Sequence, residues 1–390
     1  MTEKPATTIG LIVALWVAGL CAAAQFAKIS VIFPELLRYY PDAGSAAGFL
    51  VSLLSLLGVV LGLFAGMAVA TFGTRNLLLG ALLLGGLISL YQATLPPFSL
   101  LLASRLVEGA SHLVIVVAAP TLIAQLSSER HRAAAMTLWG TFFGVAFAIV
   151  AWFGLPLVKI HGPASLFVIH AMAMLLIAAV LLAMLPQEKA PPHHTPVLNF
   201  QDIFQQHVDT YKSAFIAAPA LGWLFYTLSF VSLLTLLPNY VAPEQRAFVI
   251  GALPLASILS SLTLGVFLLR YREAIDVVIL GFMAAVLCSA VLWFYPGSVA
   301  GCLALFAALG LVQGASFASV PQLNTNNQSR AHANGALAQM GNLGNLSGTP
   351  LLLLMTGSLG FHGLIMFVVA CYVCGLGVHL WMATRRSNPL

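Results

Sequence analysis

Residues 106–111 read LVEGAS and residues 311–316 read LVQGAS, so a hexapeptide returns 205 residues further along the chain with one substitution. Weaker matches keep nearly the same spacing: Gly66 corresponds to Gly265, and Gly80 corresponds to Gly281. A repeat at about half the length of a 390-residue chain predicts two halves that are built alike and run in the same direction.

The composition places most of the chain in lipid. Hydrophobic residues make up 60% of the chain and charged residues 7%, against the roughly 25% charged residues of soluble domains. Backbone polar groups inside a bilayer must pair internally, which leaves helices or a closed barrel. Apolar runs such as 50–70 and 98–122 favour helices, because a helix needs about 20 apolar residues to cross a bilayer.

We predict an all-α membrane protein with twelve membrane-spanning helices in two six-helix halves. A polar segment at 186–211, which contains a Pro-Pro-His-His sequence, separates the halves and is predicted to be a cytoplasmic linker. The predicted domains are therefore 1–185, 186–211 and 212–390. The predicted helices are 8–33, 46–72, 77–93, 98–126, 133–158, 164–185, 212–238, 247–269, 275–294, 299–320, 333–355 and 359–383.

The distribution of Lys and Arg predicts the orientation, since basic residues collect in loops on the cytoplasmic side. With the N-terminus inside, the cytoplasmic loops and ends carry eleven basic residues, and the outer loops carry only Arg38, Lys159 and Arg246. We therefore expect both termini in the cytoplasm and the protein in the cytoplasmic (inner) cell membrane. The net charge of +5 does not indicate a nucleic acid partner, because the basic residues never form a block.

The sequence lacks the signals of an enzyme or of a bound cofactor. Five cysteines lie in apolar runs, and the one close pair, Cys371 and Cys374, lies in the middle of a predicted helix without the spacing of a zinc site. No GxxxxGK[ST] loop, HExxH motif or serine hydrolase set is present. We expect no metal, no cofactor and no enzymatic reaction, so an ion or solute gradient supplies the energy.

Over essentially its whole length the sequence resembles the major facilitator superfamily. The loop after the second helix of that family reads Gly-x-x-x-Asp-Arg-x-Gly-Arg-Lys/Arg, and this chain keeps the two glycines, Gly66 and Gly73, and the last base, Arg75. The aspartate position holds Ala70 and the first arginine position holds Thr71, so the family's charge latch between bundles is missing. The resemblance implies the twelve-helix fold of that family, with this loop taking part in gating.

The fourth predicted helix carries a second likeness to the family. Arg105 and Gly109 match its Arg-x-x-x-Gly pattern, in which the arginine is often tied to proton coupling. The Gly-Pro pair that marks the fifth helix of drug/proton antiporters is not present, since Gly154 and Pro156 stand apart. The resemblance therefore implies transport, and the missing pair weakens the drug-efflux interpretation.

Few ionisable residues fall inside the predicted helices, and each needs a partner because a charge at mid-bilayer costs about 2.5–3.5 kcal/mol. Arg105, Glu108 and His112 share one face of the fourth helix at i, i+3 and i+7. Lys28 lies in the first helix, one turn after Gln25, and by resemblance both helices line a central cavity. We predict that Lys28, Arg105 and Gln25 bind an anionic solute. Glu108 and His112 are predicted to carry the coupling proton.

Structural roles compete with this prediction. Arg105 and Glu108 could neutralise each other and hold the fourth helix against its neighbours. Lys28 could extend to the outer membrane interface, and His112 could be a hydrogen-bonded core residue.

The second half offers neutral polar groups in place of charges. Gln313 occupies the position that matches Glu108, and Gln339, Asn342 and Asn345 follow at i, i+3 and i+6 on the eleventh helix. We predict that Gln313, Gln339 and Asn342 complete the solute site. The competing role is hydrogen bonding between closely packed helices.

These patterns predict a monomeric secondary transporter in the lipid bilayer that moves a small organic anion by alternating access, coupled to protons. One alternative is an exporter of drugs or metabolites that works by proton antiport. A second alternative is a membrane sensor that keeps the fold without transport.

Overall fold

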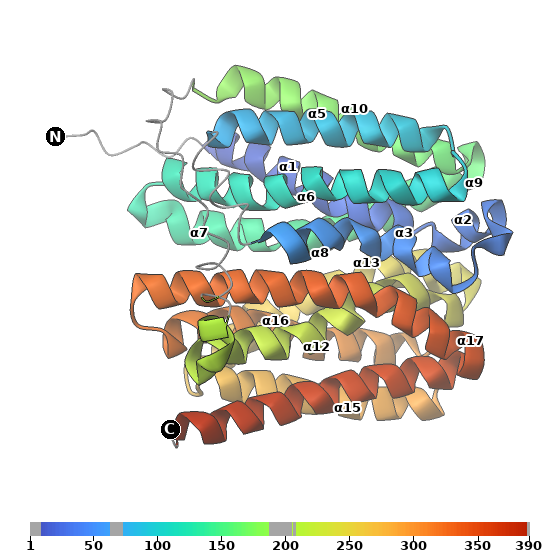
Figure 1. The fold of residues 1–390 in the computed structure, drawn as a ribbon. Coiled ribbons are helices and arrows are strands. Elements are labelled where there is room, and N and C mark those ends of the chain that lie inside the picture. Colours follow the sequence, from blue (N-terminus) through green and yellow to red (C-terminus); the bar gives the residue numbers. More distant parts are fainter. Residues whose placement is uncertain (1–8, 63–72, 187–204, 206–207, 388–390) are drawn as a thin grey trace. The chain divides into compact units, whose positions relative to one another are not determined.

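The computed structural model describes residues 9–62, 73–186, 205 and 208–387, and all regular structure in these ranges is helical (Figure 1). The chain divides into two compact units, Met1–Thr195 and Pro196–Leu390. Most of the predicted linker, 186–211, lies outside the described residues. Apolar helices of this length satisfy their own backbone hydrogen bonds, as lipid requires.

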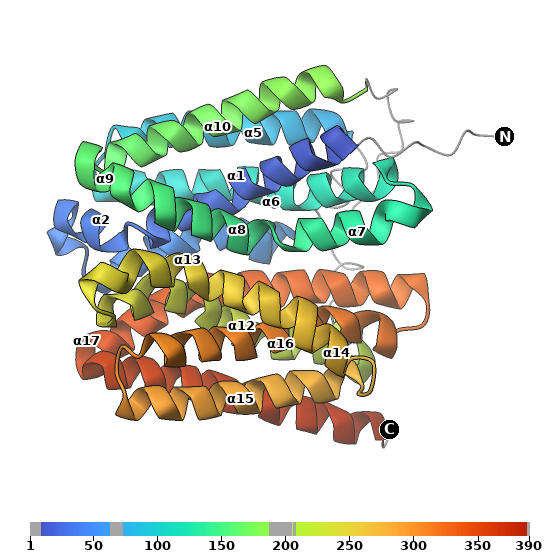
Figure 2. The same cartoon turned by 180° about the vertical axis from the view of Figure 1, so that it is seen from behind.

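The described residues of the N-terminal unit provide six spans. The first span is α1 (Ile9–Ser30), which the short helix α2 (Phe33–Tyr39) follows. The second span, Pro41–Gly62, includes two 3-10 segments (Pro41–Ala47 and Leu53–Ser55) around α3 (Gly48–Ser52). The remaining elements are α5 (Thr74–Ala93), α6 (Phe98–Leu126), α7 (Glu129–Gly140), α8 (Phe142–Ile149), a π segment (Val150–Gly154), α9 (Leu155–His161) and α10 (Pro163–Met184). Helices α5 and α10 lie side by side in both views (Figures 1 and 2).

The described residues of the C-terminal unit form five helical segments long enough to span a bilayer. They comprise α12 (Ala214–Leu236) with a 3-10 segment (Leu237–Tyr240), α13 (Pro243–Ser260) with a π segment (Ser261–Gly265) and α14 (Val266–Leu268), α15 (Ala274–Phe294), α16 (Val299–Leu323) and α17 (Asn327–Ser387).

Helix α17 supplies two spans because it reverses at one glycine. The apolar segment Ser329–Ser387 has 59 residues, which would extend about 88 Å as a straight helix, roughly three times the hydrocarbon thickness of a bilayer. Gly360 interrupts it with φ 58° and ψ −139°, a conformation that glycine adopts without a Cβ clash. The chain doubles back there (Figure 1, orange to red), so the described residues provide twelve spans and the predicted fold class is confirmed.

The outward faces of both units are apolar. Leu87 of α5 is 59% exposed, Leu176 of α10 is 67% exposed and Leu287 of α15 is 67% exposed. Monomeric soluble proteins rarely expose contiguous apolar surface, so these faces fit contact with lipid chains.

The second and fifth spans differ from the continuous helices predicted for them. The second was predicted as 46–72, but 3-10 geometry interrupts it at Leu53–Ser55, and residues 63–72 lie outside the described range. The fifth was predicted to begin at residue 133, but the chain breaks between α7 and α8 at Thr141. The Thr141 hydroxyl donates to the Leu138 carbonyl at 2.7 Å and accepts from Trp16 Nε1 at 3.3 Å, and such local bonds compete with regular helix geometry.

The repeated hexapeptide packs in a similar way in each unit. A Cβ on Gly109 of α6 would lie 2.5 Å from the Leu54 carbonyl oxygen, so α6 touches the backbone of the second span at its 3-10 segment. Gly314 of α16 faces Ser261, the first residue of the π segment after α13. The glycine of the hexapeptide therefore allows close packing against an irregular turn in both halves.

Candidate functional site

Lys28, Arg105 and Glu108 meet in the interior of the N-terminal unit. Lys28 Nζ lies 2.6 Å from Glu108 Oε1, and Arg105 pairs with the other carboxylate oxygen, Oε2. All three side chains are fully buried. The spacing on α6 predicted the Arg105–Glu108 neighbours, and the fold adds Lys28 from α1. Lys28 therefore does not extend to the membrane interface.

Arg105 is also bound to the second span. Its Nε donates to the Leu50 carbonyl at 2.7 Å, just before the 3-10 segment of Leu53–Ser55. Its Nη2 is buried without a hydrogen-bond partner among the described residues. One strong donor in the cluster therefore remains unused.

Gln92 of α5 supplies the third side chain that binds Glu108. Its Nε2 donates to Glu108 Oε2 at 2.8 Å and to Ser104 Oγ at 3.1 Å. Ser104 in turn donates to the Leu101 carbonyl at 2.6 Å. Glu108 thus accepts from residues of three helices, which is the acceptor-only role of an ionised carboxylate.

Ser89 of α5 and His170 of α10 surround the Lys28 amine. Ser89 Oγ lies 2.5 Å from Lys28 Nζ and 2.7 Å from His170 Nδ1, and Lys28 Nζ lies 3.4 Å from the same His170 nitrogen. His170 Nε2 lies 3.0 Å from the Cys21 carbonyl. A carbonyl oxygen only accepts, so Nε2 carries the hydrogen and Nδ1 is the acceptor in a neutral ring. The Phe167 ring lies below the amine, 5.3 Å away.

The cluster has an excess of positive charge when all groups are ionised. It contains two cations, Lys28 and Arg105, and one anion, Glu108, and no second carboxylate pairs with them among the described residues. A buried charge without a partner is costly in lipid. The net charge of the cluster would therefore become zero if it gained one negative charge or lost one proton.

The other two polar residues predicted for the N-terminal site lie beside the cluster without joining it. Gln25 donates from Nε2 to Ser111 Oγ at 3.0 Å, and its Oε1 has no partner among the described residues. His112 Nδ1 lies 3.1 Å from the Ala22 carbonyl, and its ring meets Phe26 edge-on at 5.1 Å. These contacts fit the core-residue role of His112, and its proton-carrying role stays a prediction.

The predicted gating loop is described only at its end. Gly66 lies outside the described residues, and Gly73 precedes α5 with φ 85°. Arg75 donates from Nε to the Leu185 carbonyl at 3.2 Å and from Nη2 to the Leu182 carbonyl at 3.1 Å. Arg75 therefore binds carbonyls at the end of α10, where a cation is favourable, and its part in gating stays a prediction.

The polar residues predicted for the C-terminal half lie within the C-terminal unit. Gln313 Oε1 accepts from the Tyr226 hydroxyl at 3.3 Å and from Ser257 Oγ at 3.4 Å. Asn342 donates to the Ala338 carbonyl of its own helix at 2.9 Å. The geometry of Gln313 fits the competing role of linking helices.

Gln339 is bound by a tyrosine that precedes α12. Its Oε1 accepts from the Tyr211 hydroxyl at 2.8 Å. Burial raises the pKa of Tyr211 to about 12, because a phenolate would lose its hydration. Tyr211 is therefore a neutral donor at physiological pH.

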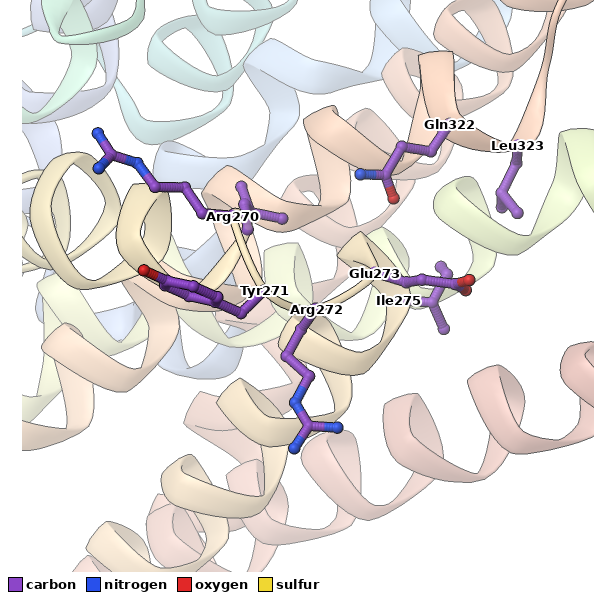
Figure 3. A pocket seen from close by; sticks show the side chains of 8 residues that line it. Arg270, Tyr271, Arg272, Glu273, Ile275, Gln322 and Leu323 are labelled. Atoms are coloured by element: carbon purple, nitrogen blue, oxygen red, sulfur yellow. The ribbon is translucent and has the colours of Figure 1, made fainter.

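A pocket of about 580 Å³ lies in the C-terminal unit between α14, α15 and the end of α16 (Figure 3). Gln322, one of its lining residues, accepts from the backbone N–H of Ala274 at 2.7 Å. Arg270 and Arg272 are exposed, and their side chains point in different directions (Figure 3). The pocket is shallow and lacks the buried, convergent charges of the Lys28 cluster.

Sequence reasoning missed three residues of the cluster, Ser89, Gln92 and His170. Ser89 and Gln92 lie on α5 and His170 lies on α10, each between apolar or aromatic neighbours in the sequence. The available signal was the cost of burying such polar groups in lipid. His170 was the most visible, since it lies between Ile169 and Ala171 in the middle of a long apolar run.

The fold and the buried cluster define a polytopic membrane protein of two helical units with an internal ionisable site, as in secondary transporters. A sequence profile of the Major Facilitator Superfamily matches residues 15–349. The chain belongs to this family, and it is a membrane transport protein. The predicted family is thereby confirmed.

A solved structure shows the same fold. A bacterial homologue of the human lysosomal transporter Spinster, in an inward-facing and unoccupied conformation, superposes with a TM-score of 0.70 at 14% sequence identity. The alignment covers 96% of this chain and 97% of that chain. At this identity the likeness concerns the fold alone. No curated protein matches the sequence significantly.

Proposed function

We propose that this protein moves a small organic anion across the cytoplasmic membrane by alternating access, together with a proton. The observation that carries the proposal is the buried cluster of Lys28, Arg105 and Glu108, which holds two cations and one anion. Ionisable residues inside membrane helices mark substrate and proton pathways in transporters. An anion that reaches this cluster would supply the missing negative charge.

The unused donor gives the anion a binding partner. Arg105 Nη2 is buried and unpaired among the described residues, while Nε and Nη1 are already bound to Leu50 and Glu108. A guanidinium binds a carboxylate or phosphate through paired N–H groups. The cluster therefore favours an organic carboxylate or phosphate over a neutral solute.

Proton coupling follows from the same charge count. The cluster attracts an anion only while it carries its excess positive charge, and that charge disappears when one proton leaves. Anion and proton are therefore expected to move in the same direction. From the sequence, Glu108 and His112 are the predicted proton carriers.

The test is a thermal-shift screen of the purified protein against small organic anions, cations and neutral solutes, because a ligand that binds the native state raises its apparent stability. Arg105→Ala is the test variant and Arg38→Ala, at an exposed position, is the matched control. Stabilisation by an anion that is lost in Arg105→Ala and kept in Arg38→Ala supports the proposal. The same anion should then enter proteoliposomes faster when the outside is acidic.

One observation favours a second candidate function, export of a cationic or lipophilic solute by proton antiport. In the C-terminal unit Trp223 stacks on Tyr226 at 4.4 Å, and Tyr226 stacks on Phe230 at 5.0 Å, and aromatic faces bind cations and apolar molecules. Stabilisation by cations that Arg105→Ala retains would move the assignment to this function. Anion binding without flux would instead indicate a sensor.

A further inference from the structure

The proposed function leaves open which group in the cluster exchanges the proton. Arg105 is excluded because a guanidinium does not deprotonate in proteins. A proton on His170 would place a third cation beside Lys28, which it contacts, so Glu108 and Lys28 remain. These candidates differ in the charges that remain in the cluster after the proton is gained or lost.

Protonation of Glu108 would leave two buried cations without a counter-charge. Lys28 and Arg105 are both fully buried and both pair with this one carboxylate, so its neutralisation removes the partner of both. Loss of a proton from Lys28 has the opposite effect, because Arg105 and Glu108 remain as a neutral ion pair. In a medium that penalises unpaired charge, the cluster changes protonation at lower cost through Lys28.

The hydrogen bonds of Glu108 also survive the loss of that proton. Arg105 and Gln92 both bind Oε2, and neither bond involves Lys28. A neutral Lys28 amine still has N–H groups to donate to Oε1, 2.6 Å away. The carboxylate is therefore satisfied in both states.

The triangle of Lys28, Ser89 and His170 can satisfy the lysine in both forms. As an ammonium, Nζ donates to Ser89 Oγ at 2.5 Å, while the Ser89 hydroxyl donates to His170 Nδ1 at 2.7 Å. As a neutral amine, Nζ has a lone pair that can accept from Ser89 once its hydroxyl rotates, and an amine N–H can reach His170 Nδ1, 3.4 Å away. The bond from His170 Nε2 to the Cys21 carbonyl fixes the tautomer that leaves Nδ1 as the acceptor.

Other titratable groups do not contact Lys28 in the part of the unit that the structure describes. Helix α6 contributes Arg105 and Glu108, α10 contributes His170, and α5 contributes only the neutral side chains of Ser89 and Gln92. His112 of α6 is turned to the Ala22 carbonyl. Glu35 and Arg38 of α2 form no ion pair or hydrogen bond with Lys28. The segments α3 and α8 carry no ionisable side chain.

We propose that Lys28 gains and loses the coupling proton, that Glu108 stays ionised against Arg105, and that Ser89 and His170 position the lysine nitrogen in both states. In the release step an N–H bond of the ammonium breaks, the electron pair stays on Nζ, and the proton passes to water. The cluster then becomes neutral and no longer retains an anion. This inference rests on the proposed function for its role in coupling.

The test is ¹⁵N NMR of the lysine side chain, which distinguishes an ammonium from an amine. A protein in which Lys4, Lys159, Lys189 and Lys212 are all replaced by Arg keeps Lys28 as its single lysine. We expect one signal that converts reversibly between the two forms over the pH range in which the protein stays folded. If the fourfold variant does not fold, the difference between wild type and Lys28→Gln identifies the same signal.

Two variants test the positioning residues. Ser89→Ala should move the midpoint of the Lys28 titration, and His170→Gln, whose amide oxygen can still accept, should move it less than His170→Phe. Ser127→Ala is the control, because Ser127 is buried and bonded to the Ile123 carbonyl at the other end of α6. A shift of the midpoint in that control equal to the shift in Ser89→Ala would show an unspecific structural effect and overturn the positioning roles.

A different result would assign the coupling proton to Glu108. If Lys28 remains an ammonium throughout while an infrared band of a protonated carboxyl appears and is absent from Glu108→Gln, the proton belongs to Glu108 and the inference is overturned. The titration needs no solute. A titrating Lys28 in a protein that shows neither anion stabilisation nor anion flux would therefore overturn the proposed transport and leave the proton site in place.

Discussion

At the scale of single residues, Glu108 connects the cluster, since it accepts from Lys28, Gln92 and Arg105 on three helices. Removing one partner of a buried ion pair leaves the other charge uncompensated, which costs about 3–5 kcal/mol. Glu108→Gln keeps the shape of the side chain but leaves two buried cations. We expect it to lower the free energy of unfolding by about that amount, measured by denaturant titration of the purified protein in detergent.

A double variant checks that charge is the cause. Lys28→Met combined with Glu108→Gln leaves Arg105 as the only charge of the three, so we expect it to unfold at a higher temperature than Glu108→Gln alone. Equal stability of Glu108→Gln and wild type would contradict this account of the cluster.

Arg105 has a role that a lysine does not fill. Its Nε binds the Leu50 carbonyl while its Nη1 binds Glu108, and this needs the fixed fork of a guanidinium. We expect Arg105→Lys to lose one of these buried bonds and to destabilise the N-terminal unit by about 1–3 kcal/mol. The measurement is the melting temperature of the purified variant, with Arg38→Lys, at an exposed position, as the control that should melt like wild type.

At the scale of elements, the contact between α6 and the second span depends on the absence of a side chain at Gly109. A Cβ there would lie 2.5 Å from the Leu54 carbonyl oxygen, which is backbone and has little freedom to move. Gly109→Ala should therefore cost about 1–3 kcal/mol through overpacking. Gly80→Ala is the matched control, because Gly80 lies within α5 with nothing near its missing Cβ, and alanine there should stabilise the helix by up to about 1 kcal/mol.

The comparison is made by the yield of monodisperse protein and by melting temperature. If Gly109→Ala and Gly80→Ala behave alike, the close approach of α6 to the 3-10 segment does not limit the packing. The same pair of results would also separate a packing effect from a change in helix propensity, since both substitutions replace a helical glycine by alanine.

The ends of several helices could be predicted from the sequence, but the interruptions within helices could not. The ends of α6, α10 and α15 were predicted to within a residue, because lipid requires about 20 apolar residues and the polar loops between them are short. The 3-10 segment at Leu53–Ser55 packs against Gly109 of α6, and the break at Thr141 combines a local bond to Leu138 with a contact from Trp16 of α1. These contacts between helices could not be predicted from the local sequence.

At the scale of the whole molecule, the fold could be predicted because a bilayer requires apolar helices of a set length. The site could be predicted only in part. Arg105 and Glu108 are three residues apart on one helix, so spacing alone joins them. Apart from Glu108, the partners of Lys28 come from α5 and α10. These two helices are largely apolar, so the sequence does not mark which face turns inward. Ser89, Gln92 and His170 therefore required the tertiary structure.

The orientation in the membrane is a property of the entire chain, and the basic residues predict it through the positive-inside rule. Lys159, near the end of α9, is assigned outside, and Arg272, between α14 and α15, is assigned inside; both are exposed. In a background without the five native cysteines, a membrane-impermeant maleimide should label Lys159→Cys on intact cells and Arg272→Cys only after the membrane is opened. The reverse pattern would place the termini outside. Labelling of Arg272→Cys on intact cells would also mean that eleven basic residues crossed the membrane, against the bias that fixes topology during insertion.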